Sequence, residues 1–143
     1  MELCCIYIET KKFKEVIDFY EKVFQIKGKV YTENRWIEFD FGSKLSIYNK
    51  KYDTELINKK KENTKFSQTY IENFKENRER PLNNIVTFNF YTKDLKKEQE
   101  RIKKLNICKV TEIMYVNITE PYYYFNVYDP EGNTIEICGD DYK

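Results

Sequence analysis

The residue with the clearest chemical potential is Glu136, which follows a turn-forming segment near the end of the chain. Residues 128–137 read Tyr-Asp-Pro-Glu-Gly-Asn-Thr-Ile-Glu-Ile. Pro130 presets φ for the start of a turn, and Gly132 or Asn133 can take positive φ, so the chain can reverse there between two strands. Side chains alternate across a strand, so the two isoleucines share the core face and Glu136 points away from it. A carboxylate so placed can bind a ligand, hold a metal ion or move a proton.

Aromatic side chains share the predicted strand faces with polar ones. Opposite the apolar, helix-covered faces lie Tyr7, Trp36, Tyr48, Tyr91, Tyr124 and Tyr128, interleaved with Glu9, Glu38, Asp40, Asn89, Asn126 and Glu136. Large rings with a few polar groups are typical of a small-molecule site, and carboxylates beside them favour cationic or planar ligands. Tyrosine is abundant throughout the chain, so solvent-facing or dimer-contact positions are the alternative for some of these residues.

The chain contains no histidine, which removes the commonest general base near neutral pH and a common metal ligand. Glu136 is the remaining candidate base, because a carboxylate in a desolvated site can acquire a useful pKa. The simpler alternative is that Glu136 only hydrogen-bonds a neighbour or a ligand. Cys5 would be a nucleophile only beside a cationic group, so a passive role is expected for it.

The bulk composition narrows the functional classes. A chain of 143 residues forms one domain or two small modules that share a core. Its formal charge of +1, from 25 basic and 24 acidic residues, gives no general attraction to nucleic acid or anionic membrane. No stretch approaches the roughly 18 apolar residues of a membrane span, and the N-terminus lacks the features of a signal peptide. The simplest prediction is therefore a cytoplasmic protein, in which the four cysteines, without paired spacing, would stay reduced.

The predicted elements occur in the same order twice. Alternating and helical hydrophobic periods predict a strand over 3–9, a helix over 13–24 and strands over 29–32, 36–41 and 45–48. A second set comprises a strand over 86–91, a helix beginning after the N-cap residue Asp94, and strands over 108–116, 122–128 and 134–138. A repeat of strand, helix and three strands is the best topological clue in the chain.

In this order the motifs resemble the vicinal oxygen chelate superfamily, which includes glyoxalase I, extradiol dioxygenases and bleomycin resistance proteins. The resemblance rests on residues 128–137, on Phe19-Tyr20 and on Asp94-Leu95, and covers about 3–49 and 84–139. It implies an α+β fold of two βαβββ modules, whose curled mixed sheets surround a central cleft with helices on the outer face. Gln25 stands where relatives commonly carry glycine, so the helix exit is expected to move toward Gly28.

We therefore expect a single glyoxalase/bleomycin-resistance-like domain over 1–143, with module one at about 1–50, a connector over 51–83 and module two at about 84–143. In the connector, an apolar helix face is formed by Phe66, Tyr70, Ile71 and Phe74, with Ser67 or Thr69 as the cap. A connector of this length usually has a structural or functional role. It either packs on the flank of the domain or acts as a lid or dimer-contact arm.

The resemblance also locates the metal positions of metal-dependent relatives. They correspond to Cys5, Thr87 and Glu136, with a fourth near Ser46. One carboxylate and one thiol supported by hydroxyls make a poor site for a divalent ion, so no metal is expected. A weak site formed by Cys5 and Glu136 is the remaining alternative.

The predicted function is metal-independent binding of a small molecule, through which the protein sequesters a cationic or aromatic antibiotic or metabolite. The predicted ligand-binding residues are Cys5, Tyr7, Trp36, Glu38, Tyr48, Thr87, Asn89, Tyr91, Tyr124, Asn126 and Glu136. Bleomycin-binding relatives lack the metal ligands and form dimers, so the resemblance implies a homodimer. One alternative is a lyase or isomerase of the same superfamily that uses Glu136 as a base or as the ligand of a weakly bound metal. Another is an interaction module whose cleft is filled by the connector.

Overall fold

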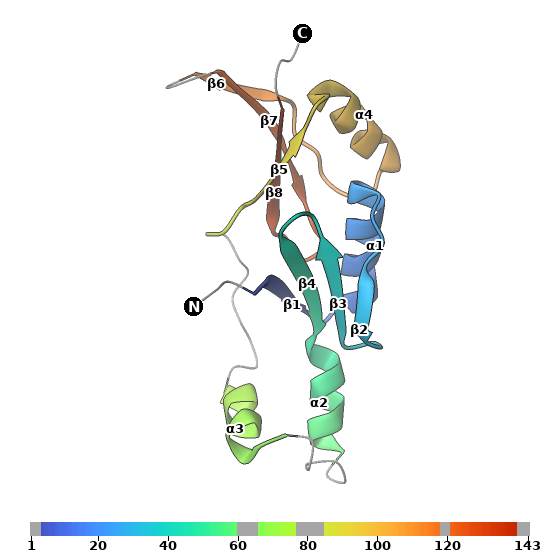
Figure 1. Cartoon of the computed structure of the whole chain (residues 1–143), viewed down its shortest axis with the longest axis vertical. Coiled ribbons are helices and arrows are strands. Elements are labelled where there is room, and N and C mark those ends of the chain that lie inside the picture. Colours follow the sequence, from blue (N-terminus) through green and yellow to red (C-terminus); the bar gives the residue numbers. More distant parts are fainter. Residues whose placement is uncertain (1–3, 60–65, 77–84, 118–120, 140–143) are drawn as a thin grey trace. The chain divides into compact units, whose positions relative to one another are not determined.

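The computed structural model describes residues 4–59, 66–76, 85–117 and 121–139. Within these ranges the chain forms two four-stranded mixed sheets and four helices, which confirms the predicted α+β fold with two modules (Figure 1). Two compact units can be distinguished: Met1–Ile17 with Ile26–Pro81, and Asp18–Gln25 with Leu82–Lys143. Helix α1 (Phe13–Phe24) begins in the first unit and ends in the second. Each unit is described separately below.

The sheet of the first unit has the strand order β1-β4-β3-β2. β1 (Ile6–Thr10) runs parallel to β4 (Lys44–Asn49), while β3 (Trp36–Asp40) and β2 (Lys29–Thr32) continue the sheet in antiparallel pairs. Alternation assigns the apolar side chains to one buried face: Ile8, Ile37, Phe39, Leu45 and Ile47. Their neighbours along each strand point to the opposite face.

The sheet of the second unit repeats this arrangement in the order β5-β8-β7-β6. Its strands are β5 (Phe88–Thr92), β8 (Thr134–Gly139), β7 (Pro121–Tyr128) and β6 (Met114–Asn117). The prediction of a strand from residue 108 was wrong, because β6 begins only at Met114. Helix α4 (Leu95–Leu105) ends at Asn106, which takes the left-handed conformation with φ 51°, and the chain then makes a single bridge between Val110 and Val127.

The two helices of the second unit are connected by hydrogen bonds. Asp94 caps α4 as predicted, with its carboxylate accepting from the backbone N–H of Lys97 at 3.0 Å. Further along α4, the guanidinium of Arg101 donates to the carbonyl oxygens of Lys22 and Val23 in the last turn of α1. These carbonyls have no partner within their own helix, so Arg101 satisfies part of its C-terminus.

The end of α1 differs from the prediction. The helix stops at Phe24, and Gln25 itself adopts φ 55°, so the expected displacement of the exit toward Gly28 was wrong. One left-handed residue costs roughly 1–2 kcal/mol, which surrounding packing can offset. Gly28 instead allows close packing against Ile37, because a Cβ at this position would lie 2.5 Å from Cδ1 of that side chain.

The connector contributes two helices to the first unit. α2 (Lys50–Asn58) continues directly from β4, and α3 (Gln68–Glu76) runs beside it (Figure 1). The predicted cap at Ser67 is confirmed, because its hydroxyl accepts from the backbone N–H of Tyr70 at 3.1 Å. Ile57 and Ile71 are buried. No helix in the described parts of the chain is long and apolar enough to span a membrane.

Candidate functional site

Equivalent positions of the two sheets carry a row of three side chains on the face away from the apolar core. In the first sheet the register aligns Tyr7, Ser46 and Glu38 across β1, β4 and β3. In the second sheet it aligns Asn89, Glu136 and Asn126 across β5, β8 and β7. We call these the first row and the second row.

Three aromatic rings gather around the first row. The ring centroids of Tyr7, Trp36 and Tyr48, which we call the aromatic triad, are 5.4 Å (Tyr7 to Trp36), 6.3 Å (Tyr7 to Tyr48) and 6.2 Å (Trp36 to Tyr48) apart. These separations lie in the range of favourable ring contacts. Tyr7 is 50% exposed whereas Tyr48 is 7% exposed, so the triad runs from the surface into the protein.

Ser46 lies in the middle of the first row and is fully buried. Its Oγ makes no hydrogen bond with any residue that the structure describes. A buried hydroxyl without a partner costs about 1–3 kcal/mol. A polar group of a ligand that reached beneath the triad would remove this cost.

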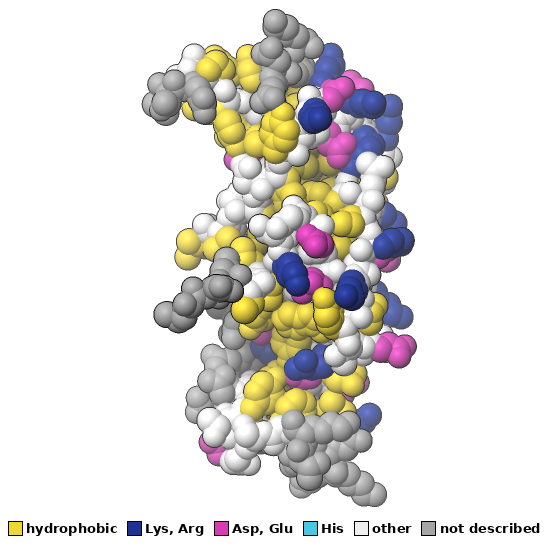
Figure 2. Space-filling view, viewed as in Figure 1, with side chains coloured by type: hydrophobic (Ala, Val, Ile, Leu, Met, Phe, Trp, Pro, Cys, Tyr) yellow, Lys and Arg dark blue, Asp and Glu magenta, His cyan; other side chains and the backbone are white. Residues whose placement is uncertain are grey.

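Two carboxylates on the polar face of the first sheet, which we call the first face, are each paired with a lysine, whereas Asp40 accepts from the backbone N–H of Gly42. The Nζ of Lys50 lies 2.6 Å from Oε1 of Glu9, and that of Lys44 lies 3.2 Å from Oε1 of Glu38, which also accepts from the Tyr31 hydroxyl. Figure 2 shows basic and acidic side chains interspersed over the surface it displays. The charge of the predicted ligand residue Glu38 is therefore already compensated within the first unit.

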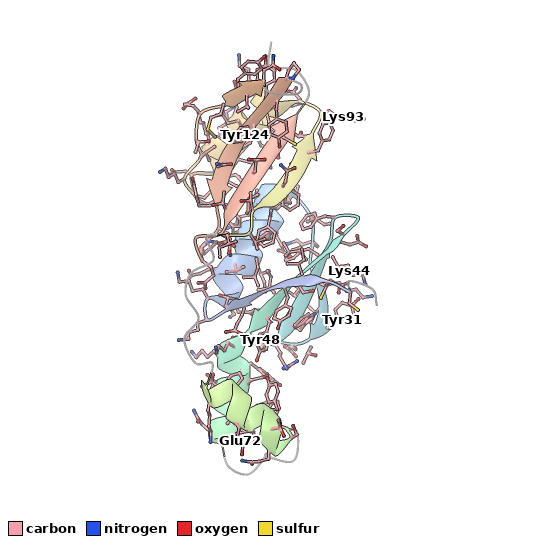
Figure 3. The ribbon with its side chains drawn as sticks, turned by 90° about the vertical axis from the view of Figure 1, so that its left-hand side faces the viewer. Tyr31, Lys44, Tyr48, Glu72, Lys93 and Tyr124 are labelled. Carbon is pink, nitrogen blue, oxygen red and sulfur yellow. The ribbon has the colours of Figure 1, made fainter. Side chains whose placement is uncertain are left out.

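The hydroxyl of Tyr48 is held by a hydrogen bond to Asp53, a fully buried residue of α2. The Asp53 carboxylate accepts from Arg35 at 2.8 and 2.9 Å, and from the hydroxyls of Tyr48 and Tyr70 at 2.7 Å each. We call these four residues the Asp53 cluster. It joins β4 and the turn before β3 to both connector helices. Figure 3 shows Tyr48 at the end of the sheet nearest α2 and α3. The sequence analysis identified neither Arg35 nor Asp53.

Asp53 remains ionised despite its burial. Burial alone would raise the pKa of Asp53, but the hydrogen bonds from Arg35, Tyr70 and Tyr48, together with the positive charge of Arg35, lower it overall. The same contacts keep Tyr48 as a donor, because burial and its hydrogen bonds raise the pKa of that phenol well above its ordinary value. The ring of Tyr48 therefore has a fixed orientation in the triad.

In the second sheet, Glu136 is held by neutral donors. Its Oε1 accepts from Nδ2 of Asn89 at 2.6 Å and from the hydroxyl of Tyr122 at 2.8 Å. Asn89 Nδ2 also donates to the Tyr122 hydroxyl at 2.8 Å, and the Sγ of Cys138 lies 3.5 Å from Asn89 Oδ1. Burial, the neighbouring Cys138 thiol and the hydrogen bond to Glu136 raise the pKa of Tyr122, so its hydroxyl stays protonated at neutral pH.

Tyr122 is a site residue that the sequence analysis missed. It shares a strand face with Tyr124, and their ring centroids are 5.5 Å apart. Strand alternation, which selected Tyr124 and Asn126, assigns Tyr122 to the same face. Strand alternation could therefore have identified Tyr122 from the sequence.

The second row lacks the charge balance of the first. No basic side chain in the described part of the chain lies within ion-pair distance of Glu136. Lys109 lies over the ring of Tyr128 instead, 5.7 Å from its centroid. Beside Glu136, Oδ1 of Asn126 is buried and has no hydrogen-bond partner among the described residues.

The other predicted site residues occupy less enclosed positions. Cys5 directly precedes β1 and is half-buried, whereas Thr87 precedes β5 and is exposed. Tyr91 is 58% exposed on β5, in register with Cys138. Cys5, Tyr7, Trp36, Glu38 and Tyr48 belong to the first unit; Thr87, Asn89, Tyr91, Tyr124, Asn126 and Glu136 belong to the second.

The residues that the resemblance assigns to the metal positions of metal-dependent relatives are Cys5 and Ser46 in the first unit and Thr87 and Glu136 in the second. One thiol, two hydroxyls and one carboxylate are a donor set that suits neither zinc nor a harder divalent ion. Oε1 of Glu136 is also engaged by Asn89 and Tyr122. Among the described residues, no three His, Cys, Asp or Glu side chains are grouped so that they could hold a metal ion. These residues therefore do not fit a resident metal.

Solved structures share this fold at low sequence identity. A lactoylglutathione lyase from Agrobacterium tumefaciens is 16% identical, with a TM-score of 0.59, over 96% of this chain and 92% of that one. The hypothetical protein SA1046 from S. aureus is 9% identical, with a TM-score of 0.67, over 98% and 95%. A bleomycin-binding protein in complex with bleomycin is 10% identical, with a TM-score of 0.57, over 99% and 100%.

No protein of curated function matches the sequence. The family relationship is nevertheless visible in the sequence itself. Residues 6–137 match the Glyoxalase/Bleomycin resistance protein/Dioxygenase superfamily, and the chain belongs to this superfamily.

Proposed function

We propose that this protein binds a small cationic or aromatic organic molecule without a resident metal and sequesters it. The observation that carries the proposal is the aromatic triad on the polar face of the first sheet, in a chain whose metal positions hold no suitable donor set. Aromatic rings with a few polar groups are typical of small-molecule sites. A protein of the same fold binds the antibiotic bleomycin, which supports this class of function.

The triad is suited to a planar ligand because its innermost ring is held in place. Tyr48 is fixed by its hydrogen bond to Asp53, so little side-chain freedom remains to be lost on binding. Tyr7 remains half exposed and Trp36 is partly buried. A planar compound stacked on these two rings would gain area and quadrupole interactions.

We further propose that the protein is a cytoplasmic homodimer. The dimer is inferred from the bleomycin-binding branch of the superfamily, and free thiols at all four cysteines are compatible with a reducing compartment. Light scattering after size-exclusion chromatography tests the dimer directly. A monomer at micromolar concentration would contradict it.

Replacing Trp36 by leucine is expected to weaken ligand binding by roughly 30-fold, because removal of a central aromatic contact typically costs about 2 kcal/mol. The compound is chosen by a thermal-shift screen, and its Kd is measured by isothermal titration calorimetry. Tyr115→Leu is the matched control, since Tyr115 is an exposed aromatic residue of the second unit that packs against Tyr123, on the sheet face opposite the second row. Equal affinities for wild type and Trp36→Leu would contradict the role of the triad.

A further inference from the structure

The two rows differ in charge, and this difference indicates where a positive group of the ligand binds. On the first face Glu9 and Glu38 are each paired with a lysine. Glu136 in the second row has only neutral donors, Asn89 and Tyr122, among the residues that the structure describes. We propose that Glu136 and Asn126 anchor a planar nitrogen cation, an amidinium or guanidinium group. This inference rests on the proposed function and identifies the chemistry of its ligand.

Two acceptors on adjacent strands are available for such a group. Asn126 and Glu136 are direct register partners on β7 and β8, and side chains so placed have Cβ atoms about 4.5–5.5 Å apart. Oε2 of Glu136 makes no hydrogen bond within the described ranges, and Oδ1 of Asn126 is buried without a partner. A planar amidinium presents two parallel N–H donors, one for each acceptor. Binding would remove the free-energy cost of the unpaired amide oxygen.

The donors to Oε1 of Glu136 hold the carboxylate in a position in which it can bind a cation. Asn89 and Tyr122 both donate to Oε1, which leaves Oε2 available as an acceptor. The Tyr122 hydroxyl remains protonated at neutral pH, so it continues to donate to Glu136. The adjacent rings of Tyr122 and Tyr124 offer aromatic surface, which also favours a cation.

The test compares benzamidine, a planar amidinium, with benzamide, its neutral counterpart of nearly the same shape. Kd values are measured by NMR titration of the untagged full chain at millimolar ligand concentrations. We expect benzamidine to bind at least about tenfold more tightly than benzamide, and Glu136→Gln to weaken benzamidine by at least about tenfold, because a hydrogen bond to a charged group is lost. Gln retains an acceptor for Asn89 and Tyr122, so the variant should fold.

Two further variants exclude indirect explanations. Glu112→Gln changes the charge of the same unit by the same amount, but Glu112 pairs with Lys103 on α4, so the Kd should change less than about twofold. Asn126→Leu removes the unpaired buried oxygen; the melting temperature of the free protein should stay the same or rise, while benzamidine binding weakens. A residue with only a structural role would not produce this combination.

Equal benzamidine affinities for wild type and Glu136→Gln would overturn the inference. The same conclusion would follow if wild-type protein bound neither benzamidine nor phenylguanidine. In either case, binding of a neutral aromatic compound in the thermal-shift screen would show that the proposed function stands while the anchor at Glu136 does not. Failure of every organic compound would contradict both.

Discussion

Replacement of Asp53 by alanine is expected to lower the free energy of unfolding by about 3 kcal/mol, since breaking a buried charge pair leaves its partner uncompensated. Asp53 is fully buried and accepts four hydrogen bonds, two of them from Arg35. The Arg35 side chain is 32% exposed, so water can rehydrate part of its charge and the effect should fall at the lower end for buried pairs. Urea denaturation of wild type and variant measures the difference.

Two controls separate the cluster from general effects on the connector. Tyr70→Phe removes one hydrogen bond to Asp53 and should cost about 1 kcal/mol. Glu55→Ala alters an exposed residue on the same helix as Asp53, whose pair with Lys51 spans 3.9 Å, and should change stability by less than about 0.5 kcal/mol. If Asp53→Ala were as stable as Glu55→Ala, the Asp53 cluster would not hold the connector to the first unit.

The contribution of Asp53 should also depend on pH. The folded state lowers the pKa of this carboxyl below its ordinary value of 3.8, so the unfolded state binds the proton more readily. The stabilisation is therefore complete above the unfolded pKa and is lost as the pH falls through the lower folded pKa. The stability difference between wild type and Asp53→Asn should stay constant from pH 7 to about 5 and shrink below pH 4.

Replacement of Asp129 by alanine is expected to lower the free energy of unfolding by about 3 kcal/mol, because several buried donors would lose their acceptor. Asp129 is 5% exposed, and its Oδ1 accepts from the backbone N–H groups of Glu131 and Asn133 at 2.9 Å each. Its Oδ2 accepts from Nδ2 of Asn133 at 2.8 Å and from the Tyr20 hydroxyl at 3.2 Å. The carboxylate thus organises the turn before β8 and connects it to α1.

Tyr20→Phe is the companion variant for Asp129. It removes only the hydrogen bond between α1 and the turn, so it should lower the free energy of unfolding by about 1 kcal/mol. Both variants are compared by chemical denaturation, with circular dichroism to confirm the fold. An Asp129→Ala protein no less stable than Tyr20→Phe would mean that Pro130 and Gly132 form the turn without the carboxylate.

Local periodicity predicted most of the fold because it reflects constraints that act over a few residues. The alternation in β3 and β8 assigned Trp36 and Glu136 to the face away from the core, and the register of both sheets agrees. The turn of residues 128–134 was also predicted, and Gly132 takes the expected positive φ of 82°. Helix α1 covers the predicted apolar positions from Phe13 to Phe24 because their spacing is unambiguous, although its exit at Gln25 was not predicted.

The connector shows where this local reading fails. The buried residues of α2 are Lys50, Asp53 and Ile57, which follow helical spacing but include two charges, so the segment reads as a solvated surface. Their burial depends on partners from distant segments: Glu9 for Lys50, and Arg35 for Asp53. Such pairs arise from packing, and no pattern within the segment encodes them.

The candidate site was predictable to the extent that it follows strand alternation. Asn89, Asn126 and Glu136 were predicted as ligand-binding residues, and the register places them side by side in one row. The charge difference between the two sheets was not predictable, because it depends on which carboxylates meet a lysine. Glu38 meets Lys44 across the antiparallel pair of β3 and β4, whereas Glu136 meets Asn89 and Tyr122.

Metal-independent binding is best tested by a thermal-shift screen of untagged protein against cationic antibiotics including bleomycin, aromatic metabolites, thiol adducts and divalent metals. The absence of a tag matters because the chain has no histidine of its own. We expect an organic compound to stabilise the protein in the presence of a chelator, by about 2.7 kcal/mol at 100 times its Kd, and to be recovered unchanged. Stabilisation by a divalent metal alone, or consumption of the bound compound, would contradict metal-independent sequestration and indicate an enzyme.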